Sequence, residues 1–293
     1  MTDATPDPAD ASDTASAPGT PAPPMPTRPV EADWLTLRRP ADEAAREGTQ
    51  RLLTRLWRDL RTCAGPEHEQ RPVRIVDVGA GTGANQAWLA PRLPFPATWT
   101  LLDHDADLLH HPVATGQGTR VHGGLDDLPR LVEADGTLTV VVGSALLDLL
   151  TYDELDTLAT LLVETATPAL FSLSVDGAVN LVPADDDDTL VADAFDAHQR
   201  RDGLAGASAA DHFSSRLREA GAEVVDATTP WRLTAAQPDL LRRYLTDRAA
   251  VAVEHDPALA DRVEAWLERR LQQVDAGTLA VVVGHVDLLA LPR

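Results

Sequence analysis

Residues 73–85 have the pattern of a strand, a glycine-rich turn and a helix in direct succession. The segment reads Val-Arg-Ile-Val-Asp-Val-Gly-Ala-Gly-Thr-Gly-Ala-Asn. Gly79 and Gly81 allow a tight turn and the close approach of a ligand, because no Cβ stands in the way. Gly83 lets the following helix pack close to the strand, and the amide groups at the start of that helix face the ligand. The segment therefore predicts a ligand site at the carboxyl end of a buried strand.

An acidic residue follows at the spacing expected for a nucleotide-binding sheet. Asp103 stands twenty residues after Gly83, at the end of the next predicted strand. A carboxylate at this place can accept both hydroxyl protons of a ribose. The turn and Asp103 together predict an adenosine-containing cofactor at the first crossover.

The rest of the chain alternates between strand-like and helix-like segments. Parallel neighbours need a helical crossover, and burial of both faces makes such strands mainly apolar, as these short segments are. Thr151 and Glu154 have the form of a capping box at the start of one helix. The fold class predicted is α/β, with a Rossmann-like, doubly wound, mostly parallel sheet of seven strands. The main strands are expected at residues 73–78, 98–102, 119–122, 138–142, 170–175, 223–226 and 279–283, with a short extra strand at 179–182.

Helical patterns supply the covering layers and one long insertion. They lie at residues 40–63, 188–201, 208–220, 239–253 and 257–274. The first is expected to open at Pro40, since proline is favoured in the first turn of a helix. Residues 230–277 separate the last two strands and form a helical insertion, whereas a hairpin needs only a few residues. So long an insertion is either a lid over the site or the surface of a homodimer, and both stay open.

Charge and cysteine content argue against several partners. The formal net charge is −21, from 46 acidic and 25 basic residues, and the chain has no lysine. Binding phosphates needs a basic stripe, whereas the arginines cluster only in short pairs such as Arg38 and Arg39, so no nucleic acid partner is expected. The single cysteine, Cys63, cannot form an internal disulfide, and no histidine and cysteine cluster has the spacing of a zinc site. We predict no bound metal and a cytoplasmic location.

Residues 1–29 are predicted to be a disordered, proline-rich tail before a domain at 30–293. They hold eight of the 22 prolines and no aromatic residue. They lack the basic start and apolar run of a signal peptide. No apolar stretch approaches the roughly 20 residues that a membrane helix needs, so no membrane partner is expected.

The glycine spacing leaves two classes of cofactor open. Gly79, Gly81 and Ala84 satisfy the dinucleotide fingerprint with alanine in its last position, so an NAD(P)-dependent oxidoreductase remains an alternative. Asp77 weighs against it, because a carboxylate beside a pyrophosphate is unfavourable. The same carboxylate suits the ammonium group of a methionine.

Residues 76–83, Val-Asp-Val-Gly-Ala-Gly-Thr-Gly, resemble the first motif of class I S-adenosylmethionine-dependent methyltransferases. The resemblance covers about residues 34–290 and is specific in the first half. It implies S-adenosyl-L-methionine as cofactor and the strand order 3-2-1-4-5-7-6 with the seventh strand antiparallel. The segments 198–201 and 284–290 also resemble a bacterial group of this family whose acceptor is unassigned. The cofactor-binding residues predicted are Asp77, Gly79, Ala80, Gly81, Gly83, Asp103, His104, Asp126, Ser144 and Arg46.

One family position does not match. The aspartate that reads the adenine amino group in the family falls here on Gly124, with Asp126 and Asp127 displaced by two or three residues. Either aspartate is a candidate for this role. The preference of a helix N-terminus for acidic residues is the alternative explanation.

Two residues are candidates for chemistry on the acceptor. Asp148, like Ser144, follows the fourth predicted strand, where open α/β sheets place substrate groups. His198 would act as general base toward a hydroxyl acceptor, because histidine titrates near neutral pH; an interface histidine is the alternative. Residues 143–148 lack the Asn-Pro-Pro-aromatic run of amino-group nucleic-acid methylases.

We therefore predict a small-molecule methyltransferase that works by alignment and exclusion of water. A non-catalytic S-adenosylmethionine-binding module, like the oxidoreductase, remains an alternative.

Overall fold

The computed structural model describes residues 31–64, 72–111, 114, 116–132 and 137–293. The predicted tail at 1–29 lies outside the described residues, and so does the side chain of Cys63. Among the helices described, none is long and apolar enough to cross a membrane.

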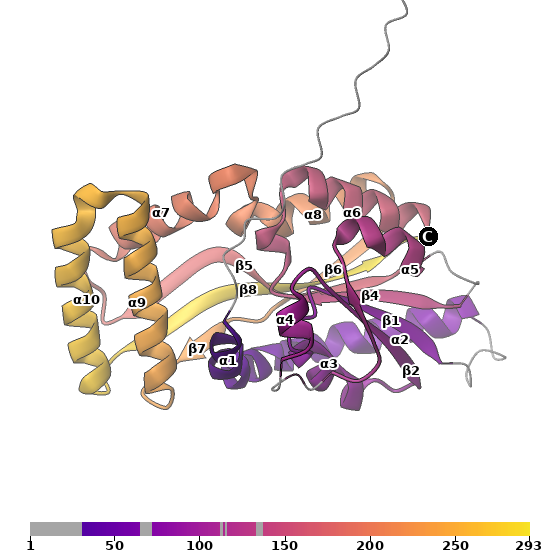
Figure 1. The fold of residues 1–293 in the computed structure, drawn as a ribbon, viewed down its shortest axis with the longest axis horizontal. Helices are drawn as coiled ribbons and strands as arrows, with labels where there is room; N and C mark the ends of the chain where they lie inside the picture. Colours follow the sequence, from indigo (N-terminus) through magenta and orange to yellow (C-terminus); the bar gives the residue numbers. More distant parts are fainter. Residues whose placement is uncertain (1–30, 65–71, 112–113, 115, 133–136) are drawn as a thin grey trace, which may run out of the picture.

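One mixed sheet runs through the molecule (Figure 1) and has eight strands over the described residues. Its order is β3-β2-β1-β4-β5-β8-β6, and the short β7 also pairs with β8. The pairs from β3 to β5 are parallel, whereas β8 is antiparallel to β5, β6 and β7. The strands are β1 Val73–Val78, β2 Ala97–Asp103, β3 Thr119–His122, β4 Thr139–Ser144, β5 Ala169–Val182, β6 Glu223–Thr228, β7 Trp231–Leu233 and β8 Ala280–Leu291.

This order confirms the predicted doubly wound sheet. β8 takes the antiparallel position that the family resemblance assigns to its seventh strand. β7 is an addition to the predicted seven strands, and with three residues it is too short to give a sequence signal.

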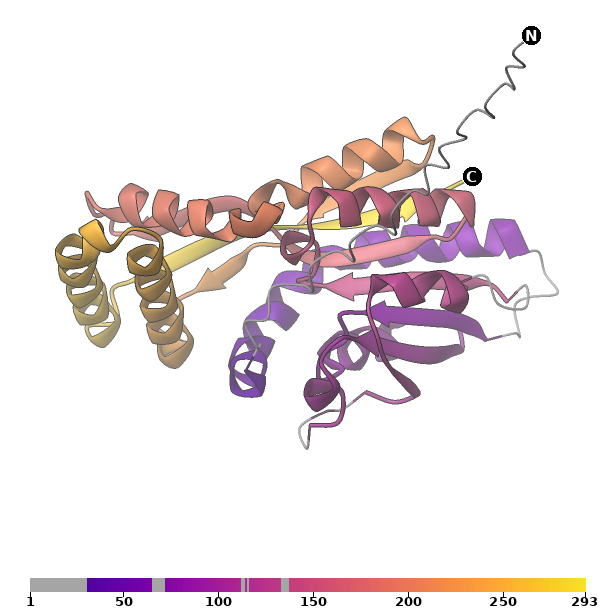
Figure 2. The ribbon, with the colours of Figure 1, turned by 45° about the horizontal axis from the view of Figure 1, so that its top comes forward.

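Helices cover both faces of the sheet (Figure 2), as expected for parallel strands whose two faces are buried. They are α1 Ala32–Ala45, α2 Gln50–Ala64, α3 Ala84–Leu89, α4 Ala106–Leu109, α5 Leu128–Val132, α6 Tyr152–Glu164, α7 Asp188–Gln199, α8 Ala209–Glu219, α9 Pro238–His255 and α10 Ala260–Asp275. α5, α6 and α8 share one core, which includes Leu155 and Phe213. α2 and α3 share another through Leu56 and Trp88. The predicted capping box is present, since Thr151 and Glu154 exchange hydrogen bonds at the start of α6.

The predicted helix from Pro40 to Cys63 is wrong in its start and in its continuity. α1 begins at Ala32 and contains Pro40, and the 3-10 turn η1, Arg46–Thr49, separates it from α2. Proline is tolerated best in a first turn, which is why the sequence favoured a start there. The break matters because Arg46 and Thr49 are both buried in this turn.

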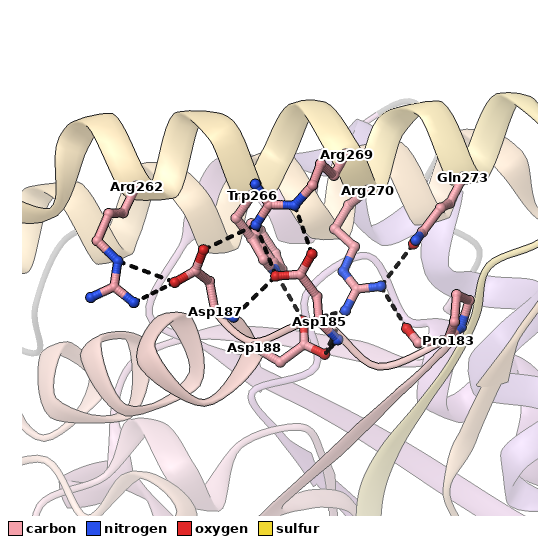
Figure 3. A network of polar contacts seen from close by, with 9 residues as sticks. All are labelled: Pro183, Asp185, Asp187, Asp188, Arg262, Trp266, Arg269, Arg270 and Gln273. Atoms are coloured by element: carbon pink, nitrogen blue, oxygen red, sulfur yellow. Dashed lines mark hydrogen bonds and ion pairs between the residues drawn. The ribbon is translucent and has the colours of Figure 1, made fainter.

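The insertion is fixed to the rest of the molecule by ion pairs (Figure 3). Arginines of α10 bind aspartates in the loop between β5 and α7 and at the first residue of α7. The pairs are Arg262 with Asp187, Arg269 with Asp185 and Asp187, and Arg270 with Asp188. The side chain of Arg270 is fully buried and also donates to the carbonyl oxygen of Pro183 at 2.7 Å. These ion pairs join α10 to the segment that precedes and opens α7. The role of the insertion as a lid or as a dimer surface stays a prediction.

Candidate functional site

The glycine-rich turn after β1 has the backbone that the sequence predicted. Gly79, Gly81 and Gly83 have φ of 66°, 51° and 81°, in the left-handed region that favours glycine. The amide nitrogen of Gly81 donates to Oδ2 of Asp103 at 2.7 Å. Asp103 thus ties the turn after β1 to the end of β2.

The carboxylate of Asp103 is already engaged with the backbone. Its Oδ1 accepts from the amide of Asp105 at 2.8 Å, and only 5% of the residue is exposed. A carboxylate has about four lone-pair sites, so two remain for hydroxyl donors. His104 beside it is exposed, with Nδ1 3.4 Å from Oδ1 of Asp103.

Asp77 is a buried carboxyl group with one free oxygen. Its Oδ1 accepts from Nδ2 of Asn85 at 2.6 Å, while its Oδ2 has no hydrogen-bond partner among the described residues. Burial raises the pKa of Asp77 to about 7, although Asn85 and Arg46 act in the opposite direction. A buried acceptor of this kind is costly to leave without a donor. The free oxygen therefore marks a place for a ligand that donates hydrogen bonds.

Arg46 lies at the other end of the same polar chain. Its Nη2 donates to Oδ1 of Asn85 at 2.8 Å and lies 3.4 Å from Oγ of Ser172. Its guanidinium stacks on the ring of Trp88 at 4.0 Å, and its Nε has no hydrogen-bond partner in the described part of the chain. Burial lowers the pKa of Arg46 to about 10, so the group is still a cation at neutral pH. Asn85 connects a buried cation to a buried carboxyl group.

A cavity lies where α1 and η1 meet the carboxyl ends of the central strands. Its walls come from α1 and η1, from α3, from the end of β4 and from the middle of β5, through Arg39, Asp42, Glu43, Arg46, Ala84, Asn85, Trp88, Ser144 and Leu173. Two of the predicted site residues, Arg46 and Ser144, are therefore brought together in one cavity.

α1 covers the glycine-rich turn. Cδ1 of Leu35 lies 3.5 Å from where a Cβ on Gly81 would be. α1 is held against β7 by Nε1 of Trp231, which donates to Oδ1 of Asp42 at 3.0 Å. Asp42 also accepts from Nε of Arg38 at 2.8 Å. α1, which begins eight residues before the predicted helix start at Pro40, is therefore part of the site.

The remaining aspartates occupy different positions. Asp148 lies in the 3-10 turn η5, Leu147–Leu149, just beyond β4, and its Oδ1 is buried without a hydrogen-bond partner among the described residues. Burial raises the pKa of Asp148. Asp126 is exposed on the turn η4, Leu125–Asp127, whereas Asp127 accepts from the amide of Gly124 at 3.0 Å. Asp127 is thus used as a cap, and Asp126 is free to face solvent or a ligand.

His198 lies away from this cavity. It is buried near the end of α7, where its Nε2 is 3.3 Å from Oε1 of Glu254 on α9. Arg201 lies 2.6 Å from the same nitrogen. These contacts are those of an interface histidine, and His198 does not line the cavity.

Sequence reasoning missed several polar residues of the site. Asn85 was part of the quoted motif but received no role, while Ser172 and Asp287 were overlooked. Each of these last two interrupts an apolar strand pattern, Phe-Ser-Leu and Val-Asp-Leu, and both are buried. A polar residue in the middle of a buried strand is the signal that would have found them, because such residues need partners.

Comparison with known proteins yields structures but no sequence family. No protein-family model matches the chain, and no curated protein matches its sequence. A cyclopropane-fatty-acyl-phospholipid synthase-like protein from Lactobacillus casei is 16% identical over 87% of this chain and 92% of its own, with a TM-score of 0.48. A SAM-dependent methyltransferase from Geobacter sulfurreducens, in complex with S-adenosyl-L-homocysteine, is 17% identical over 80% and 91%, with a TM-score of 0.36.

The plantazolicin methyltransferase BpumL, in complex with SAH, is also similar. It is 12% identical over 90% of this chain and 91% of its own, with a TM-score of 0.39. The strand order and the antiparallel β8 establish, independently of these matches, that the chain has the Rossmann-like fold with the strand arrangement implied by its resemblance to class I methyltransferases.

Proposed function

We propose that the chain is an S-adenosylmethionine-dependent methyltransferase that binds its cofactor at the turn from Gly79 to Gly83. The observation that carries this proposal is the pairing of a buried carboxyl group with a buried guanidinium beside the turn. Asp77 presents a free carboxyl oxygen and Arg46 a buried guanidinium, bridged by Asn85. An α-amino acid group carries the two complementary charges in the same small volume.

Each part of this cofactor has a candidate partner among the predicted site residues. The ammonium of the methionine part would donate to Asp77, and its carboxylate would meet Arg46. The lone pairs left on Asp103 would accept the ribose hydroxyls, with His104 beside them. Asp126 is the candidate for the adenine amino group. Gly79, Ala80, Gly81 and Gly83 would approach the cofactor with their backbone.

The same charges disfavour the oxidoreductase alternative. A pyrophosphate at the turn would bring negative charge close to Asp77, whose burial already disfavours its ionised form. The positively charged end of an amino acid favours that form instead. The choice between the two cofactors therefore depends on Asp77.

When bound, S-adenosylmethionine supplies a methyl group already activated by its sulfonium sulfur. The chain's own residues then need to align the acceptor and exclude water. α1 covers the turn, and Ser144 and Asp148 stand where β4 ends. Because its pKa is raised, the carboxylate of Asp148 is a stronger base than an exposed aspartate and can accept a proton from the acceptor.

A small-molecule acceptor fits the molecule better than a polymer. The candidate cavity lies under α1, and the net charge of −21 repels polyanions. Both features favour a compact, enclosed substrate.

Calorimetry with the purified protein tests the proposal. We expect binding of S-adenosylmethionine and S-adenosylhomocysteine and no binding of NAD. Arg46→Met and Asp103→Ala should each weaken binding, the first at the amino acid end and the second at the ribose. Binding of NAD alone would replace the proposal with the oxidoreductase.

Methyl transfer separates an enzyme from a binding module. The protein is incubated with methyl-labelled cofactor and a metabolite extract, and labelled products are collected. A labelled small molecule is the expected result. Cofactor binding without any transfer, to small molecules or to protein, would favour the non-catalytic module.

A further inference from the structure

Asp287 is a buried aspartate of β8 to which no role has been given above. It is 0% exposed, and three donors from separate parts of the chain bind it. Oγ1 of Thr49 donates to its Oδ2. Oγ1 of Thr229 and the amide of Leu173 donate to its Oδ1 at 2.7 and 2.8 Å. One carboxylate therefore joins η1, the loop between β6 and β7, and the middle of β5.

The bond to Leu173 stabilises a bulge in β5. Phe171 pairs with Leu288 and Ser174 with Val286, so that two residues of β5 lie opposite Asp287. Leu173 has φ of 57°, a left-handed conformation that costs a non-glycine residue energy. The bulge removes the Leu173 amide from the regular ladder, and Asp287 supplies the missing acceptor. Such bulges re-aim side chains, often beside active sites.

The bulge and η1 are the two supports of Arg46. Ser172, within the bulge, lies with its Oγ 3.4 Å from Nη2 of Arg46. Leu173 lines the same cavity as Arg46. Thr49 closes the 3-10 turn that Arg46 opens. Asp287 binds Leu173 and Thr49 directly, so it fixes Arg46 from both sides without touching it.

The charge of Asp287 also stabilises the cationic form of Arg46. Burial is the main influence on Arg46 and lowers its pKa, and the Asp287 carboxylate is the largest influence that opposes this effect. Thr229 lies in the loop before β7, and its methyl carbon is 3.2 Å from where a Cβ on Gly48 of η1 would be, whereas its hydroxyl donates to Asp287. Thr229→Val keeps that methyl contact and removes only the hydroxyl.

We infer that Asp287 is a positioning residue that holds Arg46 and the Ser172–Leu173 bulge in place for the amino acid end of the cofactor. This inference rests on the proposed function, since it assumes that Arg46 receives the methionine carboxylate. It assigns to Asp287 no contact with the adenosine end, which lies at the turn and Asp103.

Two ligands that differ only in the amino acid group separate these roles. S-adenosylhomocysteine carries it, whereas methylthioadenosine has the adenosine and the sulfur but no amino acid. In Asp287→Asn, which keeps the size and an acceptor oxygen, affinity for S-adenosylhomocysteine should fall about tenfold, as coupling within one buried hydrogen-bond network allows. Affinity for methylthioadenosine should stay within about twofold. A loss of fold alone would weaken both ligands together.

Two threonine variants provide a matched comparison that needs no change at Asp287. Thr49→Val and Thr229→Val each remove one hydroxyl donor to the same carboxylate. Thr49→Val should selectively weaken S-adenosylhomocysteine, because it releases the turn that carries Arg46, and Thr229→Val should do so less. Should Asp287→Asn fail to fold, this pair decides the question.

These measurements distinguish a failure of the inference about Asp287 from a failure of the proposed function. Wild-type protein that binds neither ligand would overturn the proposed function and this inference with it. Wild-type protein that binds both, with Asp287→Asn unchanged or weakened equally toward both, would overturn only the inference. Equal selectivity in the two threonine variants would also overturn it.

Discussion

Replacement of Asp77 by asparagine should make the ligand-free protein more stable at neutral pH while weakening its hold on the cofactor. The side chain is fully buried, and burial raises its pKa from 3.8 to about 7. Asparagine has nearly the same shape and still offers an oxygen to Nδ2 of Asn85, but it carries no charge to bury. The substitution therefore isolates the cost of an ionised carboxylate in this position.

The size of the effect follows from proton linkage. Between about pH 4 and pH 7 the folded state keeps a proton on Asp77 that the unfolded chain has lost, so stability falls as pH rises through this window. Each unit of pKa difference corresponds to about 1.4 kcal/mol. The penalty is on the order of 2 kcal/mol at pH 5 and about 4 kcal/mol at pH 8. Asp77→Asn should exceed the wild type in unfolding free energy by up to these amounts.

Urea unfolding followed by tryptophan fluorescence at pH 5 and pH 8 measures this difference. Asp226→Asn is the control, since it removes one negative charge from an exposed position on β6. The control should show no comparable gain. Asp77→Asn should also weaken S-adenosylhomocysteine binding, because the ammonium loses its carboxylate. A variant whose stability parallels that of the wild type at both pH values would refute the reasoning, since Asp77 would then titrate as it does in the unfolded chain.

Three further substitutions test other parts of the site and its surroundings. Gly81→Arg should abolish cofactor binding in calorimetry, because the position has φ of 51° and faces the proposed ligand. Gly221→Arg, at a surface position with φ of 92°, is the matched control and should bind the cofactor as the wild type does. His198→Ala should lower the unfolding free energy by about 1 kcal/mol through loss of the α7–α9 contacts, while methyl transfer per folded molecule stays unchanged. A drop in turnover at full stability would instead support His198 as the general base. Arg270→Met should lower the free energy of unfolding in urea by about 3 kcal/mol, because it leaves Asp188 without its buried cation. Arg262→Met, which removes an exposed partner of Asp187, should lower it by less than about 1 kcal/mol, and equal losses would contradict the ion-pair account.

Local patterns predicted the sheet because each strand carries its own signal. β1, with its acidic residue and alternating glycines, has the predicted bounds, and the turn has the left-handed glycines that the motif requires. The order of the strands was implied by the resemblance to class I methyltransferases and not by the local patterns, and the sheet has that order. Pro40 misled the prediction because its local preference for a first turn was overridden by the packing of α1 against β7.

β5 shows why other parts were beyond sequence reasoning. The segment Asp176-Gly177 looks like a turn, so the strand was predicted in two pieces. Pairing with β8 along both halves holds it extended over 14 residues. The sequence likewise could not predict the neighbours of Arg46, because Ser172 lies 126 positions away in the chain. Contacts at such separation leave no local pattern.

β8 gives the chain a particular order of assembly. It follows β6 and β7 in the sequence but lies between β5 and β6 in the sheet, and β7 pairs with it as well. During synthesis β6 and β7 therefore cannot form their pairs in the sheet until β8 has left the ribosome. β8 also carries Asp287, so the sheet edge and the supports of Arg46 are completed in the same late step. A nascent chain that ends before this strand would hold a finished glycine-rich turn beside an unfinished amino acid pocket.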